Sequence, residues 1–96
     1  MPCVYILHSD RTNKFYMGSS REDDALSRLR SHNQSKTRST KSGIPWRLIH
    51  EEKLLDYTLA RKREIFLKSG VGRQWVDQNF GQIKLERWQS GRMRRS

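Results

Sequence analysis

The stretch CVYILHSDRTNKFYMGSS, residues 3–20, restricts the possible folds more than any other part of the chain. Residues 3–9 and 14–19 alternate as strands do, and the turn-forming residues Asp10, Thr12 and Asn13 lie between them. We therefore expect a β-hairpin in which Leu7 lies opposite Tyr16 and Tyr5 lies opposite Gly18.

The two faces of this hairpin differ, because side chains two positions apart in a strand share a face. One face is apolar and suits a hydrophobic core: Val4, Ile6, Phe15 and Met17. The other face combines two phenols with a leucine and a glycine: Tyr5, Leu7, Tyr16 and Gly18. The tyrosines should be diagonal neighbours, with open space over Gly18. We interpret this second face as the floor of a site.

The rest of the chain predicts five further segments: a helix over 22–33, a polar and basic loop over 34–45, a strand over 46–54, and helices over 57–69 and 72–80. The most economical architecture is an α+β fold, with a three-stranded antiparallel sheet flanked by helices in the order β-β-α-β-α-α. We expect one domain over residues 1–81, followed by a basic, disordered tail over 82–96.

Three of these segments carry more detailed local signals. The first helix has an apolar stripe, formed by Ala25, Leu26 and Leu29. Asp56 should cap the helix that follows it, with Gly70 ending that helix. In the third strand, the alternation of side chains should place Trp46, Leu48 and His50 on one face.

Charge is the clearest feature of the composition. The chain has 20 Lys and Arg against 10 Asp and Glu, a net charge of +10. From residue 25 to residue 50 the charged side chains are all basic: Arg28, Arg30, Lys36, Arg38, Lys41 and Arg47. A polyanion such as nucleic acid would explain this concentration of charge.

Other features of the composition exclude some classes of protein and some kinds of site. No apolar run approaches the roughly 20 residues of a membrane helix, and no signal peptide is evident, so we expect a cytoplasmic protein without a membrane partner. A single cysteine, Cys3, excludes an internal disulfide. Cys3, His8 and His50 do not have the spacing of a zinc site.

Five short motifs occur in an order that resembles the GIY-YIG nuclease domain: VYI at 4–6, YMG at 16–18, RLRSHN at 28–33, PWRL at 45–48 and ARKREIFLKSGVGRQW at 60–75. The resemblance covers about residues 3–80 and is greatest to the small stand-alone bacterial members, which are excinuclease-subunit-C-like. Two positions depart from the family pattern, with Val4 in place of glycine and Met17 in place of isoleucine.

The resemblance implies a metal-dependent endonuclease that hydrolyses phosphodiester bonds. No segment resembles a base-reading recognition helix, so we expect the enzyme to recognise DNA by its structure, as in repair or recombination. The residues that match the family's catalytic positions are Tyr5, Tyr16, Arg28, His32, Glu64 and Asn79. The resemblance also assigns the single divalent ion, Mg²⁺ or Mn²⁺, to Glu64.

The residue types suit this chemistry. Phosphodiester hydrolysis needs an activated water and neutralised phosphate charge. Tyr5, in preference to Tyr16, is expected to take the proton of the water, directly or through His32. Arg28 offers a bidentate fork for phosphate oxygens, and Glu64 offers a hard oxygen ligand. We assign DNA contact to one glycine and to the basic residues around the site: Gly18, Arg30, Lys36, Arg38, Lys41 and Arg47.

Alternatives remain open at this stage. Tyrosines on a strand face are usually packing residues, and Glu64 stands among basic residues that would make it an ordinary ion-pair partner. The protein would then be a catalytically weak nucleic-acid-binding module that uses the same basic face. A general basic protein bound to ribosomes or RNA would leave the face with Tyr5, Tyr16 and Gly18 unexplained. We expect a monomer or a weak dimer.

Overall fold

The computed structural model describes the backbone of residues 1–93 and the side chains of residues 1–85. In this part of the chain the elements follow the order β1 (Cys3–Ser9), β2 (Phe15–Ser20), α1 (Ala25–Asn33), η1 (Arg38–Gly43), β3 (Trp46–Lys53), α2 (Tyr57–Lys68) and α3 (Gly70–Met93). The strands form one antiparallel sheet in the order β2-β1-β3. This confirms the predicted α+β class and the order of its elements, with the 3₁₀ helix η1 inside the predicted basic loop.

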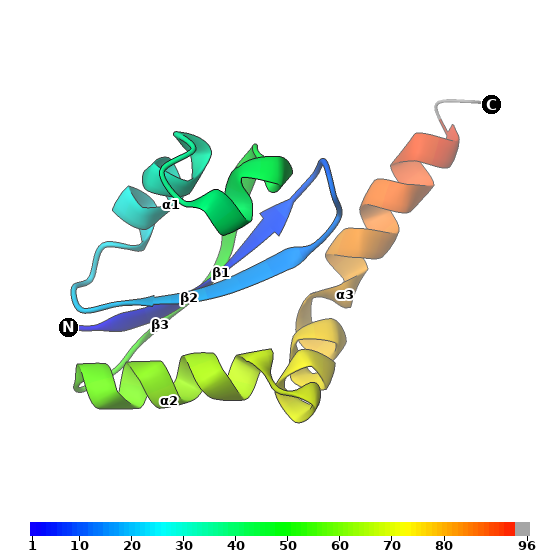
Figure 1. The fold of residues 1–96 in the computed structure, drawn as a ribbon. Coiled ribbons are helices and arrows are strands. Elements are labelled where there is room, and N and C mark those ends of the chain that lie inside the picture. Colours follow the sequence, from blue (N-terminus) through cyan, green and yellow to red (C-terminus); the bar gives the residue numbers. More distant parts are fainter. Residues whose placement is uncertain (94–96) are drawn as a thin grey trace.

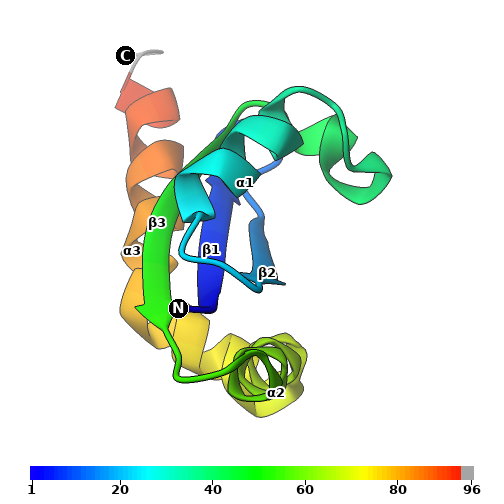
Figure 2. The ribbon, with the colours of Figure 1, turned by 90° about the vertical axis from the view of Figure 1, so that its left-hand side faces the viewer.

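The elements form three layers. Helices α1 and η1 cover one face of the sheet, and α2 with the first part of α3 covers the other (Figure 1). Figure 2 shows strand β2 at one edge of the sheet, between α1 with η1 above it and α2 below it. The edge formed by β2 is therefore approached by helices from both faces.

The hairpin has the predicted register. Tyr5 lies opposite Gly18 and Leu7 lies opposite Tyr16 in the pairing of β1 with β2. The predicted core face is also confirmed, because Val4, Ile6 and Met17 are buried against α2 and α3. A hydrophobic cluster on that face joins the sheet to α2 and α3: Val4, Ile6, Met17, Ala60, Leu67 and Val76.

The third strand differs from the prediction by a β-bulge. Leu7 pairs with Leu48, but the next residue back along β1, Ile6, pairs with His50, so Ile49 is the extra residue. The bulge moves His50 away from the face that carries Leu48. Its ring instead packs 5.1 Å from the Phe80 ring on the side of α3.

Helix α1 also differs from the predicted apolar stripe. Ala25 is buried and Leu29 packs against the core, but Leu26 is 61% exposed. His32 takes the inward position instead and is 4% exposed. A histidine therefore occupies a position on α1 that an apolar residue would normally fill.

The start of α2 follows the capping chemistry of the sequence, but Ser69 is the C-cap and Gly70 opens α3 instead of ending α2. The Asp56 carboxylate accepts a hydrogen bond from the Leu59 backbone N–H at 2.8 Å, which confirms the predicted cap. The helix ends at Lys68, and α3 begins at Gly70. The junction is tight, since a Cβ at Gly72 would lie 1.8 Å from the Phe66 carbonyl oxygen. Glycine at position 72 allows α3 to turn directly out of α2.

Helix α3 is longer than the sequence suggests. We expected the last helix to end near Phe80, but the backbone is helical to Met93 (Figure 1). No proline follows Pro45, and a glycine inside a helix costs only about 1 kcal/mol, so Gly81 does not end the helix. Residues 94–96 of the predicted tail lie outside the described residues, and the domain boundary at residue 81 stays a prediction. No described helix combines the length and apolarity needed to cross a membrane.

Candidate active site

Two tyrosines, a histidine and a threonine meet between the sheet and the layer formed by α1 and η1. Tyr5 and Tyr16 come from the sheet, His32 from the last turn of α1 and Thr40 from η1. The Tyr5 hydroxyl lies 3.1 Å from His32 Nε2, and His32 Nδ1 lies 2.9 Å from the Thr40 hydroxyl. The ring centroids of Tyr16 and His32 are 4.9 Å apart. Both predicted catalytic tyrosines therefore contact His32, the third predicted catalytic residue of this group.

The hydrogen bonds of Thr40 determine where the protons of this group lie. The Thr40 hydroxyl donates to the Thr37 carbonyl at 3.2 Å, so its oxygen accepts the hydrogen bond from His32. His32 therefore carries its proton on Nδ1, and Nε2 is an acceptor. Tyr5 must then donate its hydroxyl proton to Nε2. The result is a directed chain from Tyr5 through His32 to Thr40.

Electrostatics keep both aromatic partners neutral. Burial raises the pKa of the Tyr5 phenol above its ordinary value, and the neighbouring Tyr16 adds to this effect. Burial also lowers the pKa of His32, with a further contribution from the Arg28 charge. Tyr5 therefore does not ionise readily. It can accept a proton from water when its own proton moves to His32.

Gly18 has a different role from the one that the sequence suggests. The expected open space over Gly18 is filled by the Tyr5 ring, because a Cβ at position 18 would lie 2.6 Å from Tyr5 Cζ and Oη. Glycine at this position allows the phenol to pack directly against the backbone of β2 and to reach His32. A contact between Gly18 and DNA stays a prediction.

Arg28 lies one helical turn before His32, and two polar groups hold its side chain. Arg28 Nε donates to the Ser20 hydroxyl at 3.3 Å and lies 3.4 Å from a carboxylate oxygen of Asp24. Within the described residues, no hydrogen bond engages the two terminal nitrogens of its guanidinium group. The Arg28 side chain is 49% exposed, so this fork is accessible to a phosphate.

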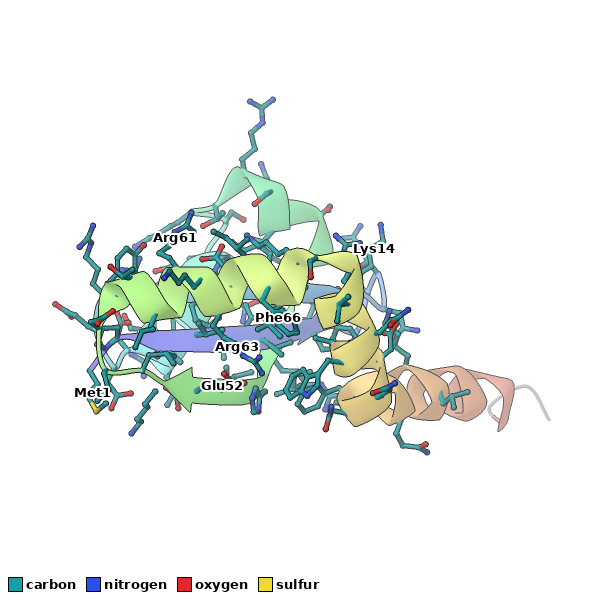
Figure 3. The ribbon with its side chains drawn as sticks, turned by 90° about the horizontal axis from the view of Figure 1, so that it is seen from below. Met1, Lys14, Glu52, Arg61, Arg63 and Phe66 are labelled. Carbon is teal, nitrogen blue, oxygen red and sulfur yellow. The ribbon has the colours of Figure 1, made fainter. Side chains whose placement is uncertain are left out.

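Glu64 is buried on α2, although its neighbours in sequence are basic. Its side chain is 8% exposed. The Ser19 hydroxyl and Arg61 Nη1 donate to Oε1, and Lys68 Nζ donates to Oε2 at 2.6 Å. Figure 3 shows Arg61 on the side of α2 away from Glu52 and strand β3. Burial alone would raise the pKa of Glu64, but the hydrogen bonds from Lys68 and Ser19 outweigh it and hold the pKa below its ordinary value.

The end of strand β2 connects Arg28 with Glu64. Ser19 and Ser20 are adjacent, so their side chains project to opposite faces of the sheet. Ser19 contacts Glu64 on the α2 side, and Ser20 contacts Arg28 on the α1 side. Lys68 Nζ, bound to Glu64, also lies 5.9 Å from the centroid of the Tyr16 ring. The candidate site therefore surrounds the edge of the sheet that β2 forms.

The residues at this edge fit a single hard cation. Among the described residues, no three acidic, histidine or cysteine side chains gather at a preformed metal site. Glu64 would supply one carboxylate oxygen, and its depressed pKa keeps it ionised. Mg²⁺ commonly binds through one or two carboxylates, with water and substrate phosphates completing its coordination. The donor set is therefore sufficient, although Arg61 and Lys68 already neutralise the carboxylate.

Asn79 lies apart from this group. It is exposed on α3, and its side-chain amide donates to the Trp75 carbonyl at 2.8 Å. No contact within the described residues joins Asn79 to Tyr5, His32 or Glu64. Its catalytic role stays a prediction.

The basic residues assigned to DNA contact are all exposed: Arg30, Lys36, Arg38, Lys41 and Arg47. They lie on α1, on η1, on the segment that joins these helices and at the start of β3. Arg47 Nη2 is 3.8 Å from an Asp10 carboxylate oxygen, so part of its charge is already neutralised. The others are on the same layer as His32 and Arg28, which is the arrangement that the prediction requires.

A cavity of about 450 Å³ lies behind the hairpin and is separate from the site. Its lining comes from the hairpin and from α3: Lys14, Phe15, Met17, Arg73, Val76, Asp77 and Lys84. None of the predicted catalytic residues lines it. Tyr5, Tyr16, Arg28, His32 and Glu64 therefore lie away from this cavity.

Three groups that position the site were not predicted as site residues: Ser19, Ser20 and Thr40. Lys68 was expected only as one of the basic neighbours that would make Glu64 an ion-pair partner. Lys68 follows Glu64 by four residues, and that spacing on a helix is a recognisable ion-pair signal. Thr40 and the two serines have no such signal, because their contacts join residues from separate elements. Only the tertiary structure brings them together.

The chain was also compared with known protein families, curated proteins and solved structures. Neither the curated proteins nor the solved structures give a match to the chain. The family model described as the GIY-YIG catalytic domain matches residues 1–75, which contain Tyr5, Tyr16, Arg28, His32 and Glu64. This match covers more than three quarters of the chain, and the protein therefore belongs to the GIY-YIG family.

Proposed function

We propose that this protein is a metal-dependent endonuclease that hydrolyses phosphodiester bonds in DNA and selects its substrate by structure. Membership of the GIY-YIG family implies a nuclease that binds nucleic acid. The metal dependence, the preference for DNA and a role in repair or recombination are our proposal.

One observation carries the proposal: a hydrogen-bonded chain of Tyr5, His32 and Thr40, an accessible guanidinium group and a buried carboxylate surround the same edge of the sheet. Tyr5 donates to His32, and His32 donates to Thr40. The Arg28 side chain is held by Ser20, next to the residue that binds Glu64. An ordinary packing face does not require this combination of groups.

The relay accounts for the activation of water in the proposed mechanism. Tyr5 accepts the proton of the attacking water while its own proton passes to His32 Nε2, so no free phenolate has to form. Thr40 holds the Nδ1 proton and keeps the His32 ring in the accepting tautomer. Tyr16 packs against His32 and limits the movement of the ring.

Arg28 and Glu64 account for the stabilisation of charge. The Arg28 fork binds two non-bridging phosphate oxygens and neutralises the charge that grows on them. Glu64 would hold the divalent ion, Mg²⁺ or Mn²⁺, which supplies Lewis-acid polarisation of the phosphate. Ser19 fixes the orientation of the Glu64 carboxylate. Asn79 would have to act from α3, and we keep it as the least supported member of the catalytic set.

The basic layer around η1 supports recognition of the DNA backbone. It presents exposed lysines and arginines, a pattern suited to phosphates and not to base edges. Specificity would then come from the shape of a branched, nicked or flapped substrate. We propose that the protein acts in the cytoplasm as a monomer or a weak dimer, in keeping with its free and buried Cys3.

A second candidate function is a nucleic-acid-binding module with little catalysis. The ion pairs at Glu64 favour it, because Arg61 and Lys68 neutralise the carboxylate that should bind metal. The Tyr5–His32–Thr40 chain would then be a structural hydrogen-bond network. The two candidate functions predict different results in one experiment: only the nuclease should cleave nucleic acid when a divalent ion is present.

A cleavage assay on a panel of nucleic acids tests the proposal. Branched, flapped, nicked, linear and single-stranded DNA, with matched RNAs, are incubated with Mg²⁺, Mn²⁺ or EDTA. We expect cleavage of at least one branched or nicked DNA with either metal ion and none in EDTA. Binding without cleavage across the whole panel would favour the binding module.

A further inference from the structure

Lys68 forms an ion pair with Glu64, the residue proposed to bind the metal ion. We infer that the Lys68 ammonium group occupies the carboxylate oxygen that a divalent ion would bind, so that Lys68 competes with the metal ion at Glu64. This inference rests on the proposed function. It assigns to Lys68 a role as a positioning residue that sets the affinity of the site for metal.

The two oxygens of Glu64 have different partners. Oε1 accepts from Ser19 and from Arg61 Nη1, the latter at 2.8 Å. Oε2 accepts from Lys68 Nζ at 2.6 Å, and this is its one hydrogen bond within the described residues. Oε1 is therefore held by two donors, and Oε2 becomes available as soon as Lys68 leaves.

The side chains also differ in their freedom to move. Glu64 is 8% exposed, whereas the Lys68 side chain is 46% exposed. A buried carboxylate fixed by Ser19 cannot turn toward a metal ion in solution, but a partly exposed lysine with four rotatable carbons can turn away. The Lys68 ammonium group, and not the Glu64 carboxylate, is therefore the group that has to move when a metal ion binds.

Charge makes the competition direct. One carboxylate carries two cationic partners, so the group has a net charge of +1 before a metal ion arrives. A divalent ion within about 4 Å of the ammonium group would be repelled, and partly buried surroundings screen this repulsion less than water does. Displaced Lys68 does not have to move far, because its Nζ already lies 5.9 Å from the Tyr16 ring centroid.

A metal titration of the full chain, without DNA, tests this inference. The dissociation constant for Mn²⁺ is measured by calorimetry for the parent, Lys68→Met and Lys68→Gln. Lys62→Met is the matched control, because Lys62 is exposed on the same helix, two residues from Glu64 and on another side of it. It removes the same charge without touching the carboxylate.

We expect Lys68→Met and Lys68→Gln to tighten Mn²⁺ binding by at least about fivefold, from loss of the competing ion pair and of local repulsion. Lys62→Met should change the dissociation constant less than about twofold, since exposed charges are screened. Glu64→Gln should abolish the heat of binding, which places the ion at this carboxylate.

Three results would overturn the inference: Lys68 variants that bind Mn²⁺ no more tightly than Lys62→Met, unchanged binding in Glu64→Gln, or no Mn²⁺ binding in any variant. The proposed function is judged separately by the cleavage panel. Metal-dependent cleavage combined with unchanged affinity in the Lys68 variants would leave the nuclease standing and remove this role of Lys68.

Discussion

Tyr5 and Ile6 are neighbours in β1 and both are buried, yet they serve opposite faces of the sheet. Ile6 packs in a cluster of aliphatic side chains against α2 and α3. Tyr5 packs against Gly18 and donates a hydrogen bond to His32. Hydrophobic burial and close packing stabilise the face that carries Ile6, whereas the arrangement of the face that carries Tyr5 depends on the positions of single polar atoms.

This contrast teaches where stability and activity can be separated. On the aliphatic face the stabilising quantity is buried apolar area, so removing methyl groups should lower stability. On the face with Tyr5 and His32, removal of one oxygen changes the area very little but interrupts the relay. Substitutions on the two faces should therefore have different signatures.

The largest effect is expected for Tyr5→Phe. The variant keeps the ring over Gly18 but removes the hydroxyl group that we propose exchanges protons, and general acid–base catalysis contributes about 10²–10⁴-fold. We expect kcat for DNA cleavage to fall by about 10³-fold, measured in single-turnover reactions. The cost in stability should be near 1 kcal/mol, from the hydrogen bond that His32 loses. A variant that cleaves within threefold of the parent would remove Tyr5 from the mechanism.

Ile6→Ala should show the opposite signature. Ile6 is 0% exposed in the aliphatic cluster, and such truncations cost about 2–5 kcal/mol. We expect the melting temperature to fall by at least about 8 °C for a domain of this size. Cleavage at a temperature where the variant is folded should remain within about threefold of the parent. A kcat loss as large as that of Tyr5→Phe would mean that the two faces are not separable.

The exposed basic residues on and next to η1 give a smaller effect. Replacing Lys36, Arg38 and Lys41 with alanine should lower DNA affinity and reduce the slope of log K against log salt by up to about three units. Lys14, Arg73 and Lys84, on the other side of the hairpin, provide a control with the same loss of charge. Fluorescence anisotropy at several salt concentrations measures both slopes. Equal changes in both triple variants would show that the η1 layer has no special role.

The smallest effect is the pH dependence that His32 adds to stability. Because its pKa is lowered below 6.5, the folded protein binds fewer protons than the unfolded chain just below that pH. His32 should therefore reduce the stability of the protein as pH falls below about 6.5, by at most about 1.4 kcal/mol per pH unit. Urea denaturation at pH 7.5 and 5.5 compares the parent with His32→Gln. Identical pH slopes in the two proteins would contradict the neutral, buried His32.

The hairpin and the core could be predicted from the sequence because their signals are local. The four-residue loop between the strands indicated the pairing of Tyr5 with Gly18, and the alternating apolar residues of β1 and β2 identified the face that is buried. The position of His50 could not be predicted, because a bulge between β1 and β3 depends on the pairing of distant strands. The end of α3 at Met93 could not be predicted either, because the local helix propensity of the sequence did not indicate where the helix ends.

The candidate site was only partly predictable for a similar reason. Motif order selected Tyr5, Tyr16, Arg28, His32 and Glu64, and the structure brings these residues to one edge of the sheet. The order of the motifs could not show that the Tyr5 ring fills the space over Gly18, or that Thr40 sets the position of the proton on His32. Those facts depend on the packing of η1 and α1 on the sheet.

Cleavage by Glu64→Gln is the most direct test of the account. The substitution preserves size but removes the charge that would hold the cation, while net charge rises by one. We expect cleavage in Mg²⁺ to fall by at least about 10²-fold, roughly 2.7 kcal/mol, with DNA binding equal or tighter. Glu52→Gln is the matched control, because Glu52 pairs with Arg63 of α2 at 2.8 Å on the side toward β3, away from the site. It should cleave within about threefold of the parent. Cleavage by Glu64→Gln at the parental rate would contradict the assignment of this edge of the sheet as a nuclease site.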